Sequence, residues 1–334
     1  MYLEEQAPTA VTAPEITWAL PRQPTVLETT LRFIRRKPLG AFGFLLVFIL
    51  IAMTLGTPKA EFGVPSLPSR PFGYELGQPW MARYDAEKQF KDANTGRLVQ
   101  YDSPSWEHWL GSDKAGRDTW ARIVFGARRS LFVGLWALAL ATAIGTFIGV
   151  VSGFFRGWLD TAMQRVMDAL QSFPPLITLI LIITINPFTE GPSLTIAAFA
   201  LGFVGITSVQ RIVRGVVLST REQPYVEAAR VIGATNARTM FYHILPNITA
   251  AIIVVFSIGL GAVILAEAAL GFIVPSAVPQ TPSWGLMLNE GRAVIVDHPW
   301  PGVFSASAIA LAVLGFNLAG DALRDVLDPR LRLG

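Results

Sequence analysis

The sequence contains no cysteine, and only three of its 334 residues are histidine. Disulfides and thiolate metal sites are therefore excluded. Charged residues are also scarce: they make up 15% of the chain, whereas a soluble domain carries about 25%. The net charge of +3 is too small to indicate nucleic-acid binding. Hydrophobic residues, in contrast, reach 52%, which predicts an all-α polytopic membrane protein surrounded by lipid.

Six apolar runs are long enough, or nearly so, to cross a bilayer as helices. We predict transmembrane spans over about residues 39–56, 131–155, 166–186, 194–217, 247–274 and 302–318. Pro174 and Pro175 interrupt the third run and predict a kink or a break there. Basic residues cluster before the first run and in the loops on the same side, which predicts that both termini are cytoplasmic. The chain then divides into a cytoplasmic tail (1–38), a first span (39–56), an extracytoplasmic insert with the segment leading into the second span (57–129), a five-helix core (130–320) and a cytoplasmic tail (321–334).

Small and acidic residues within the spans suggest separate roles. Gly145, Gly149 and Gly153 recur at four-residue intervals, which lets another helix approach closely, so we assign them to helix packing alone. Glu267 lies twenty residues into the fifth span, ~30 Å along a helix and thus near its outer end. Because acidic residues in spans are often functional, Glu267 is a candidate outer gate. Alternatively, Glu267 and Asp168 could couple an ion gradient to transport.

The predicted outer segments hold three further patterns. Residues 91–98 have the composition of a hairpin turn. His108 and His298 both fall outside, so a shared metal site is conceivable, although interfacial hydrogen bonding is the favoured interpretation. Residues 111–118 come close to a phosphate-binding loop, but Arg and Asp replace the Lys and the Ser or Thr that this loop needs. ATP must therefore bind to another subunit if it drives this protein.

The stretch between residues 221 and 246 is amphipathic, although two long apolar runs flank it. Thr220 and Gln223 have the spacing of a capping box, and Pro224 suits the first turn of a helix. Gly233 can adopt the left-handed conformation that ends a helix. The pattern therefore predicts a short helix that ends at this glycine.

A second short helix is predicted to follow the first. Asn236 suits its N-cap, and Pro246 is expected to end it. The two helices would form an elbow, residues 218–246, which lies on the membrane surface and carries Glu227. This pattern also fits an amphipathic helix that lies in the lipid interface.

The motifs of the elbow resemble the coupling loop of ABC-importer permeases. The match consists of Glu227-Ala228-Ala229, Gly233 and Ile244-Leu245-Pro246 at the spacing of that family. In the family, this loop docks into a groove on the ATPase subunit. The resemblance implies that the residues coupling the chain to an ATPase are Tyr225, Glu227, Ala228, Ala229, Gly233, Leu245 and Pro246.

The similarity covers roughly residues 30–334 and includes Leu110-Gly111-Ser112-Asp113 and Pro282-Ser283-Trp284-Gly285. These motifs resemble the C-type permease of the dipeptide, oligopeptide and nickel importers. The resemblance implies a type I ABC-importer permease fold with six transmembrane helices, in the inner membrane of a bacterial or archaeal cell. It also implies a second, non-identical permease, two cytoplasmic ATPase subunits or domains, and an extracytoplasmic solute-binding protein. ATP and magnesium are expected on the ATPases, and no cofactor is expected on this chain.

We therefore predict a non-catalytic subunit of an ATP-driven importer. Di- or oligopeptides are the expected cargo, and nickel or another small solute is the alternative. An ion-coupled secondary transporter that uses Glu267 would instead work as a single chain. The third possibility is a membrane-embedded enzyme, but the sequence offers no arrangement of catalytic residues that supports it.

Overall fold

The computed structural model describes residues 33–55, 81–92, 96–185, 193–279 and 281–327. Over these residues the chain is helical, and its only strand-like pairings are three isolated antiparallel bridges. The tail predicted for residues 1–38 falls almost wholly outside this description. The described helices are α2 (Pro38–Leu55), α3 (Thr119–Phe155), α4 (Gly157–Gln171), α5 (Pro175–Thr184), α6 (Leu194–Thr220), α7 (Pro224–Val231), α8 (Asn236–Arg238), a π-turn (Thr239–Ile244), α9 (Leu245–Ile273), a 3₁₀ turn (Pro275–Ala277), α10 (Trp284–Arg292) and α11 (Trp300–Leu327).

Four helices in the described part of the chain are long and apolar enough to cross a membrane: α3, α6, α11 and the continuous run Asn236–Ile273. Helices α4 and α5 pass the same test together, but they meet at an angle of 83°, as a broken span or a re-entrant loop would. Helix α2 is apolar but shorter. The chain is thus an all-helical, multi-pass membrane protein, and the count of six spans stays a prediction.

The break in the third span is confirmed. Helix α4 ends at Gln171, and Pro175 occupies the first turn of α5. Pro174 has an extended backbone, with ψ of 131°, because a residue that precedes a proline is sterically excluded from the helical region. The two prolines therefore divide one apolar run into two helices that point in different directions.

Two helices extend beyond the spans predicted for them. Helix α3 begins at Thr119 rather than at residue 131, because the Asp118 carboxylate caps it by accepting a hydrogen bond from the Ala121 amide at 2.7 Å. Helix α11 extends to Leu327 rather than ending at residue 318, so the predicted tail begins as helix. The hairpin turn is confirmed by the bridge between Lys91 and Leu98.

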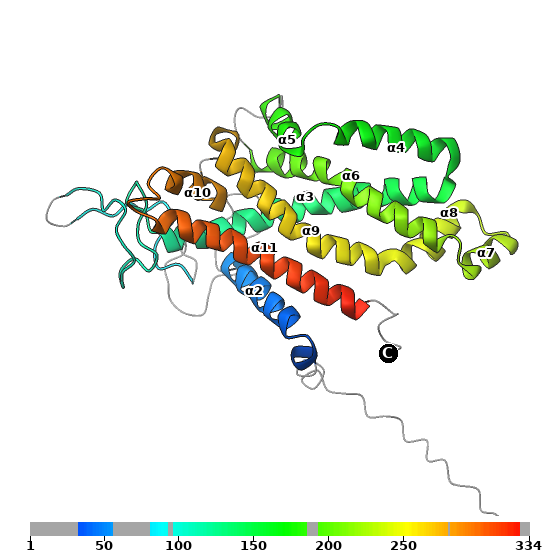
Figure 1. Cartoon of the computed structure of the whole chain (residues 1–334), viewed down its shortest axis with the longest axis horizontal. Coiled ribbons are helices and arrows are strands. Elements are labelled where there is room, and N and C mark those ends of the chain that lie inside the picture. The colour runs from blue at the N-terminus through cyan, green and yellow to red at the C-terminus, as the bar shows by residue number, and fades with distance from the viewer. Residues whose placement is uncertain (1–32, 56–80, 93–95, 186–192, 280, 328–334) are drawn as a thin grey trace, which may run out of the picture.

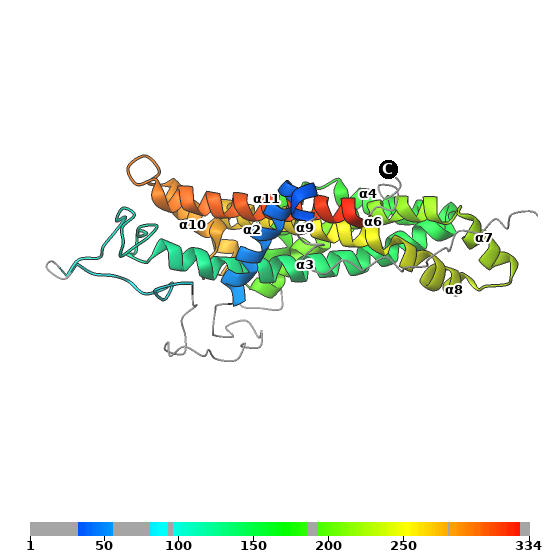
Figure 2. The same cartoon turned by 90° about the horizontal axis from the view of Figure 1, so that it is seen from below.

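The long helices lie roughly along one axis, and different structures occupy the two ends of the molecule (Figures 1 and 2). The described part of the insert before α3, residues 81–92 and 96–118, lies at one end together with α10. Helices α7 and α8 lie at the opposite end. Helix α2 packs against α11 on one side of the molecule, while α4 and α5 lie on the other side (Figure 1). We call these ends the insert end and the elbow end.

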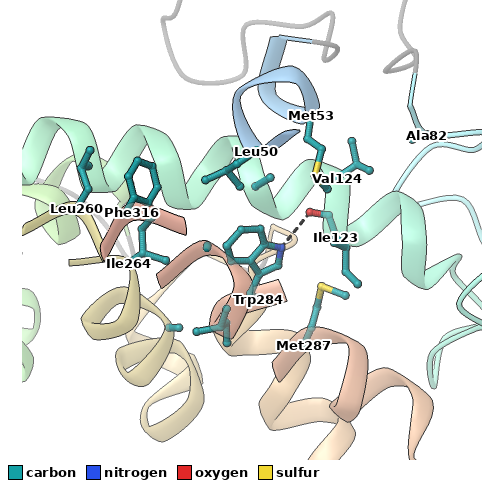
Figure 3. Packing of buried hydrophobic residues seen from close by; sticks show 14 of the residues in the cluster. Leu50, Met53, Ala82, Ile123, Val124, Leu260, Ile264, Trp284, Met287 and Phe316 are labelled. Carbon is teal, nitrogen blue, oxygen red and sulfur yellow. Dashed lines mark hydrogen bonds between the residues drawn. The ribbon is translucent and has the colours of Figure 1, made fainter. Parts of the chain in front are cut away.

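A buried tryptophan anchors α10 to the transmembrane helices (Figure 3). Trp284 is 1% exposed, and its indole Nε1 donates to the Ile123 carbonyl at 3.0 Å. A β-carbon at Gly126 would lie 2.9 Å from the indole, so only glycine lets the ring pack there. Ile264 and Phe316 belong to the same cluster, which thus joins α3, α9, α10 and α11.

The second-span glycines lie where α3 meets α6. A β-carbon at Gly145, Gly149 or Gly153 would come within 2.9 Å of a valine side chain on α6. Because each glycine leaves room for one valine, the two helices pack closely along most of their length. The facing valines are Val209, Val213 and Val217.

Candidate functional site

The elbow is a short projecting structure between α6 and α9. Helix α7 begins with Pro224 in its first turn, as the sequence predicts. The predicted capping box is wrong, because Thr220 is the last residue of α6 and its carbonyl accepts from the Gln223 amide at 3.1 Å. Gln223 is the N-cap, and its side chain makes no capping hydrogen bond.

The turn after α7 requires a glycine. Gly233 has a φ of +85°, which is the left-handed conformation predicted for it. The Gly233 amide donates to the Arg230 carbonyl at 3.0 Å, and the Ala234 amide donates to the Ala229 carbonyl at 3.0 Å. These two bonds close the end of α7 and reverse the direction of the chain.

The second helix begins one residue earlier than predicted and does not end at the proline. Thr235, not Asn236, is the N-cap, since its hydroxyl accepts from the Arg238 amide at 3.3 Å. Pro246 lies in the first turn of α9 rather than at a helix end. Proline has no N–H to donate to the carbonyl of Tyr242, and its ring would clash with that carbonyl. The helix accommodates the ring by widening into a π-turn before α9, so it runs on into the membrane.

One face of the elbow packs onto the chain itself. Val226 is fully buried and Ala229 is 4% exposed. Both are covered by the π-turn, the start of α9 and the adjoining ends of α3 and α6; the cluster around Val226 includes Phe154, Val217, Met240, Ile244 and Ile248. Ala229 is therefore buried by its own chain, and its role in coupling to an ATPase stays a prediction.

The opposite face of the elbow is open, and we call it the elbow face. Val231 and Ile232 are each 83% exposed at its tip. The elbow face also carries Tyr225, Glu227 and Ala228, all exposed. Burial of part of the Tyr225 ring raises the pKa of its hydroxyl. Of the remaining predicted coupling residues, Leu245 is half-buried and Pro246 is exposed at the start of α9, behind this face.

Polar contacts hold the base of the elbow to the end of α3. The Arg221 guanidinium donates to the Phe154 carbonyl, and Arg156 pairs with Glu222 at 2.9 Å. Arg230 lies over the Phe154 ring, 5.3 Å from its centroid. Glu227 makes no ion pair within the described residues and points a carboxylate into solvent. The elbow is thus fixed to three helices and presents an apolar tip beside one acidic group.

Comparison with known proteins assigns the chain to a family. The family model described as a binding-protein-dependent transport system inner membrane component matches residues 145–333, which include the whole elbow. The dipeptide transport system permease protein DppC of Alkalihalophilus pseudofirmus is 42% identical over 240 residues, which cover 72% of this chain and 78% of that protein. The chain belongs to this family.

A second relative agrees with this membership. The glutathione transport system permease protein GsiD of Escherichia coli is 39% identical over 253 residues, which cover 76% of this chain and 80% of GsiD. A crystal structure of an amino acid ABC transporter with histidines matches 64% of this chain and 94% of its own, with 19% identity and a TM-score of 0.48.

At the insert end of the chain, Glu267 belongs to a buried cluster of charged and polar side chains. It is 1% exposed on α9, accepts a hydrogen bond from the Ser130 hydroxyl at 2.9 Å, and lies 3.6 Å from the Arg129 Nε. Arg129 also donates to the carbonyls of Pro279 and Thr281, at 2.9 and 2.7 Å. The cluster therefore ties α9 to α3 and to the loop before α10. The role of Glu267 as an outer gate stays a prediction.

The two histidines have separate partners. His108 and Asp118 are both buried, and the His108 Nδ1 lies 2.9 Å from the Asp118 carboxylate, which confirms the hydrogen-bonding interpretation for His108. His298 stacks on Tyr101 with ring centroids 5.0 Å apart and planes at 10°. Since Tyr101 belongs to the insert and His298 precedes α11, this stack fastens the insert to the helices.

In residues 111–118, the segment that resembles a phosphate loop, the carboxylate of Asp113 binds backbone amides of the loop itself. The Asp113 carboxylate accepts from the amides of Ala115 and Arg117, at 2.8 and 2.9 Å, and also binds the Arg117 and Arg122 guanidinium groups. Burial opposes charge on Arg117, but Asp113 and two glutamates outweigh it and raise its pKa. Glu290 of α10 pairs with Arg122 at 2.6 Å and so joins α10 to the network.

The sequence did not identify these partners. Arg122 and Arg129 are predicted outside the membrane, yet both are buried on α3. Apart from Asp113, their partners lie on α9, on α10 and in the loop between them, more than 130 residues further along the chain. A lone sequence holds no signal for such distant pairs. The exposed pair at the elbow tip was predictable from the sequence, because Val231 and Ile232 are adjacent aliphatic residues directly before the turn glycine.

Proposed function

We propose that the chain is a permease subunit of an ATP-driven importer of di- or oligopeptides and that its elbow receives the movement of a cytoplasmic ATPase. The single observation that supports this most strongly is the elbow face. A short helix is buried on one side by its own chain, while its tip exposes Val231 and Ile232, each 83% exposed. Exposed apolar groups that are held rigidly in this way favour a protein partner.

The chemistry of the two ends supports the orientation. Five arginines lie in or beside the elbow, which favours a cytoplasmic location for the elbow and for both termini. The solute-binding protein would then meet the insert end. One chain carries one elbow, so a two-fold transporter needs a second permease and two ATPase sites, and membership of the family supports a non-identical partner. ATP and magnesium would bind to the ATPases, and this chain would hold no cofactor and catalyse no reaction.

The cargo follows from the relatives. DppC is named for dipeptide transport and GsiD for glutathione transport, which supports a peptide over nickel as the solute. Ion-coupled transport through Glu267 is not favoured, because Arg129 and Ser130 already hold that carboxylate in a buried cluster.

The structure supports a mechanism in which the elbow acts as a rigid lever. Arg221 and Arg156 fasten the elbow to α3, and the glycine contacts fasten α3 to α6. A displacement of α7 would therefore move these helices together rather than bend the loop. When ATP closes the ATPases, two such elbows would approach each other, and the bundle would shift between inward-open and outward-open states.

The test uses the complete importer, reconstituted in proteoliposomes with the partner permease, the ATPases and the binding protein. Dipeptide-loaded binding protein should stimulate ATP hydrolysis and uptake in the wild-type complex. Glu227→Lys or Gly233→Asp should abolish both, while the chain still reaches the membrane. Uptake by this chain alone, driven by a proton gradient, would contradict the proposal. Uptake of Ni²⁺ without uptake of peptide would retain the permease role and refute the cargo.

A further inference from the structure

A second polar region lies in the transmembrane helices, away from the elbow face. A cavity of about 370 Å³ opens between α6 and the bent pair α4–α5. This volume is within the range of small-ligand pockets. Half of its lining is apolar, and the other half is unusually polar for a membrane helix. The polar lining consists of Gln171, Thr178, Thr207, Ser208 and Arg211.

Two arginines of α6 approach two aspartates of α4, but their geometries differ. Arg214 grips Asp160 with two hydrogen bonds of 2.7 Å, and these side chains are 28% and 13% exposed. Arg211 reaches Asp168 only at 3.4 Å, and these side chains are 56% and 57% exposed. The first pair has the geometry of a structural ion pair. The second is loose and open, although both join the same two helices.

The Arg211 guanidinium has donors to spare. Its one short contact is from Nη2 to the Gln171 side-chain oxygen at 2.6 Å, and the long contact to Asp168 uses the same nitrogen. Within the described residues, no other hydrogen bond from this guanidinium is present. A guanidinium offers five N–H groups in a planar fork that suits a carboxylate. Arg211 therefore presents a carboxylate-binding group to the cavity.

The cavity adjoins a larger groove. Ser208 lines both the cavity and an apolar groove of about 690 Å³ between α6 and α9. Ser208 and Arg211 are one helical turn apart and thus form a polar strip along α6. Threonine hydroxyls and the Gln171 amide add groups that pair with peptide N–H and C=O. This mixture of cation, amide and hydroxyls fits a peptide better than a lipid tail, which needs no hydroxyl partners.

We infer that the cavity is a cargo subsite of the membrane pathway and that Arg211 binds the C-terminal carboxylate of a peptide in transit. The inference rests on the proposed peptide-importer function and adds a substrate-contacting residue to it. Arg214, the neighbouring arginine, has a structural role and does not contact cargo. The apolar groove beyond Ser208 accommodates the remainder of the peptide.

The experiment compares two cargoes in the reconstituted importer: dialanine and its C-terminal amide, each supplied with saturating binding protein. The permease carries Arg211→Gln, Arg211→Lys or the matched control Arg214→Gln. Because the same binding protein serves every variant, its own preference cancels in the ratio of the two uptake rates. Arg211→Gln should lower uptake of dialanine about tenfold relative to the amide, since one charge-assisted contact is lost. Arg211→Lys should recover part of this loss, and Arg214→Gln should lower both rates equally.

The outcomes separate this inference from the proposed function. Equal losses for both cargoes in Arg211→Gln would overturn the subsite, because they would show a merely structural role. If the variant does not assemble, Arg211→Lys allows the same comparison. A loss for both cargoes that occurs in phosphatidylglycerol vesicles but not in phosphatidylcholine vesicles would show that Arg211 binds an anionic lipid headgroup, which also overturns the subsite. A wild-type importer that takes up neither cargo would refute the peptide-import function itself.

Discussion

The insert end and the elbow end of this protein differ in how they accommodate charged side chains. At the insert end, charged groups are buried and paired within the chain: Arg122 is 1% exposed and bound by Asp113 and Glu290. At the elbow end, the charged pair of Arg156 and Glu222 is exposed, at 47% and 60%, and large aliphatic side chains face solvent. In the described part of the chain, the buried charges of the insert end find their partners within one chain, whereas the elbow end presents Val231 and Ile232 to solvent.

This difference indicates where rigidity and where recognition reside. Breaking a buried ion pair leaves an uncompensated charge and costs about 3–5 kcal/mol, whereas an exposed pair contributes about 0–1 kcal/mol. Removing a side chain at the insert end should therefore reduce stability. Removing a side chain at the elbow face should instead reduce coupling to the ATPase and leave the fold intact. Four variants test this contrast, in order of decreasing expected effect.

The largest effect is expected for Glu267→Ala at the insert end. The substitution leaves the buried Arg129 without its anion and should destabilise the chain by about 3–5 kcal/mol. Thermal unfolding of the purified protein in detergent would measure the loss. The double variant Arg129→Ala/Glu267→Ala should lose less than the sum of the two single variants, because the pair is coupled. Additive losses would show that the two groups do not interact.

The second effect is expected for the tip variant Val231→Asp/Ile232→Asp. Central apolar anchors of an interface each contribute about 2 kcal/mol or more, so ATPase binding should weaken at least about thirtyfold. Co-purification of the ATPase with the permease would measure the loss, and the unfolding temperature should not change. Val296→Asp is the matched control, because Val296 is 90% exposed at the insert end. If both variants lost ATPase binding equally, the elbow tip would not be the specific binding surface, and this contrast between the two ends would not hold.

The third effect is expected for Gly233→Ala. Its φ of +85° is unfavourable for a residue with a β-carbon, and the strain should cost about 1–2 kcal/mol. No atom of the described chain lies within 4 Å of the added methyl group, so backbone strain alone acts. Peptide-driven ATP hydrolysis should fall together with protection of the elbow amides from hydrogen exchange. Gly215→Ala is the control, because its β-carbon also meets nothing and its backbone is helical.

The smallest effect is expected for Glu222→Ala, which removes the exposed partner of Arg156. The loss in stability should be within about 1 kcal/mol and should shrink further at high salt. Thermal unfolding at two salt concentrations would measure it. A loss as large as that of Glu267→Ala would mean that the elbow end depends on its charged pairs as much as the insert end does.

Much of the fold was predictable because it depends on local chemistry. Apolar runs located every long helix, Pro174 and Pro175 located the break, and Gly233 located the turn. Each of these features arises from one residue's own backbone or from its immediate neighbours. The errors at Thr220 and Pro246 are also local: each residue could stop one helix or begin another, and packing selected between the two.

The sequence alone determined the class of the protein and the elbow, since hydrophobicity, proline and glycine act through the chain's own backbone and through lipid. The tertiary structure alone decided which charges are buried, because Arg129 and Glu267, or Arg122 and Glu290, meet only after distant helices pack. It also decided that Ala229 faces inward and Val231 outward. Both outcomes depend on how α7 rotates against α3 and α9, which no periodicity in eight residues determines.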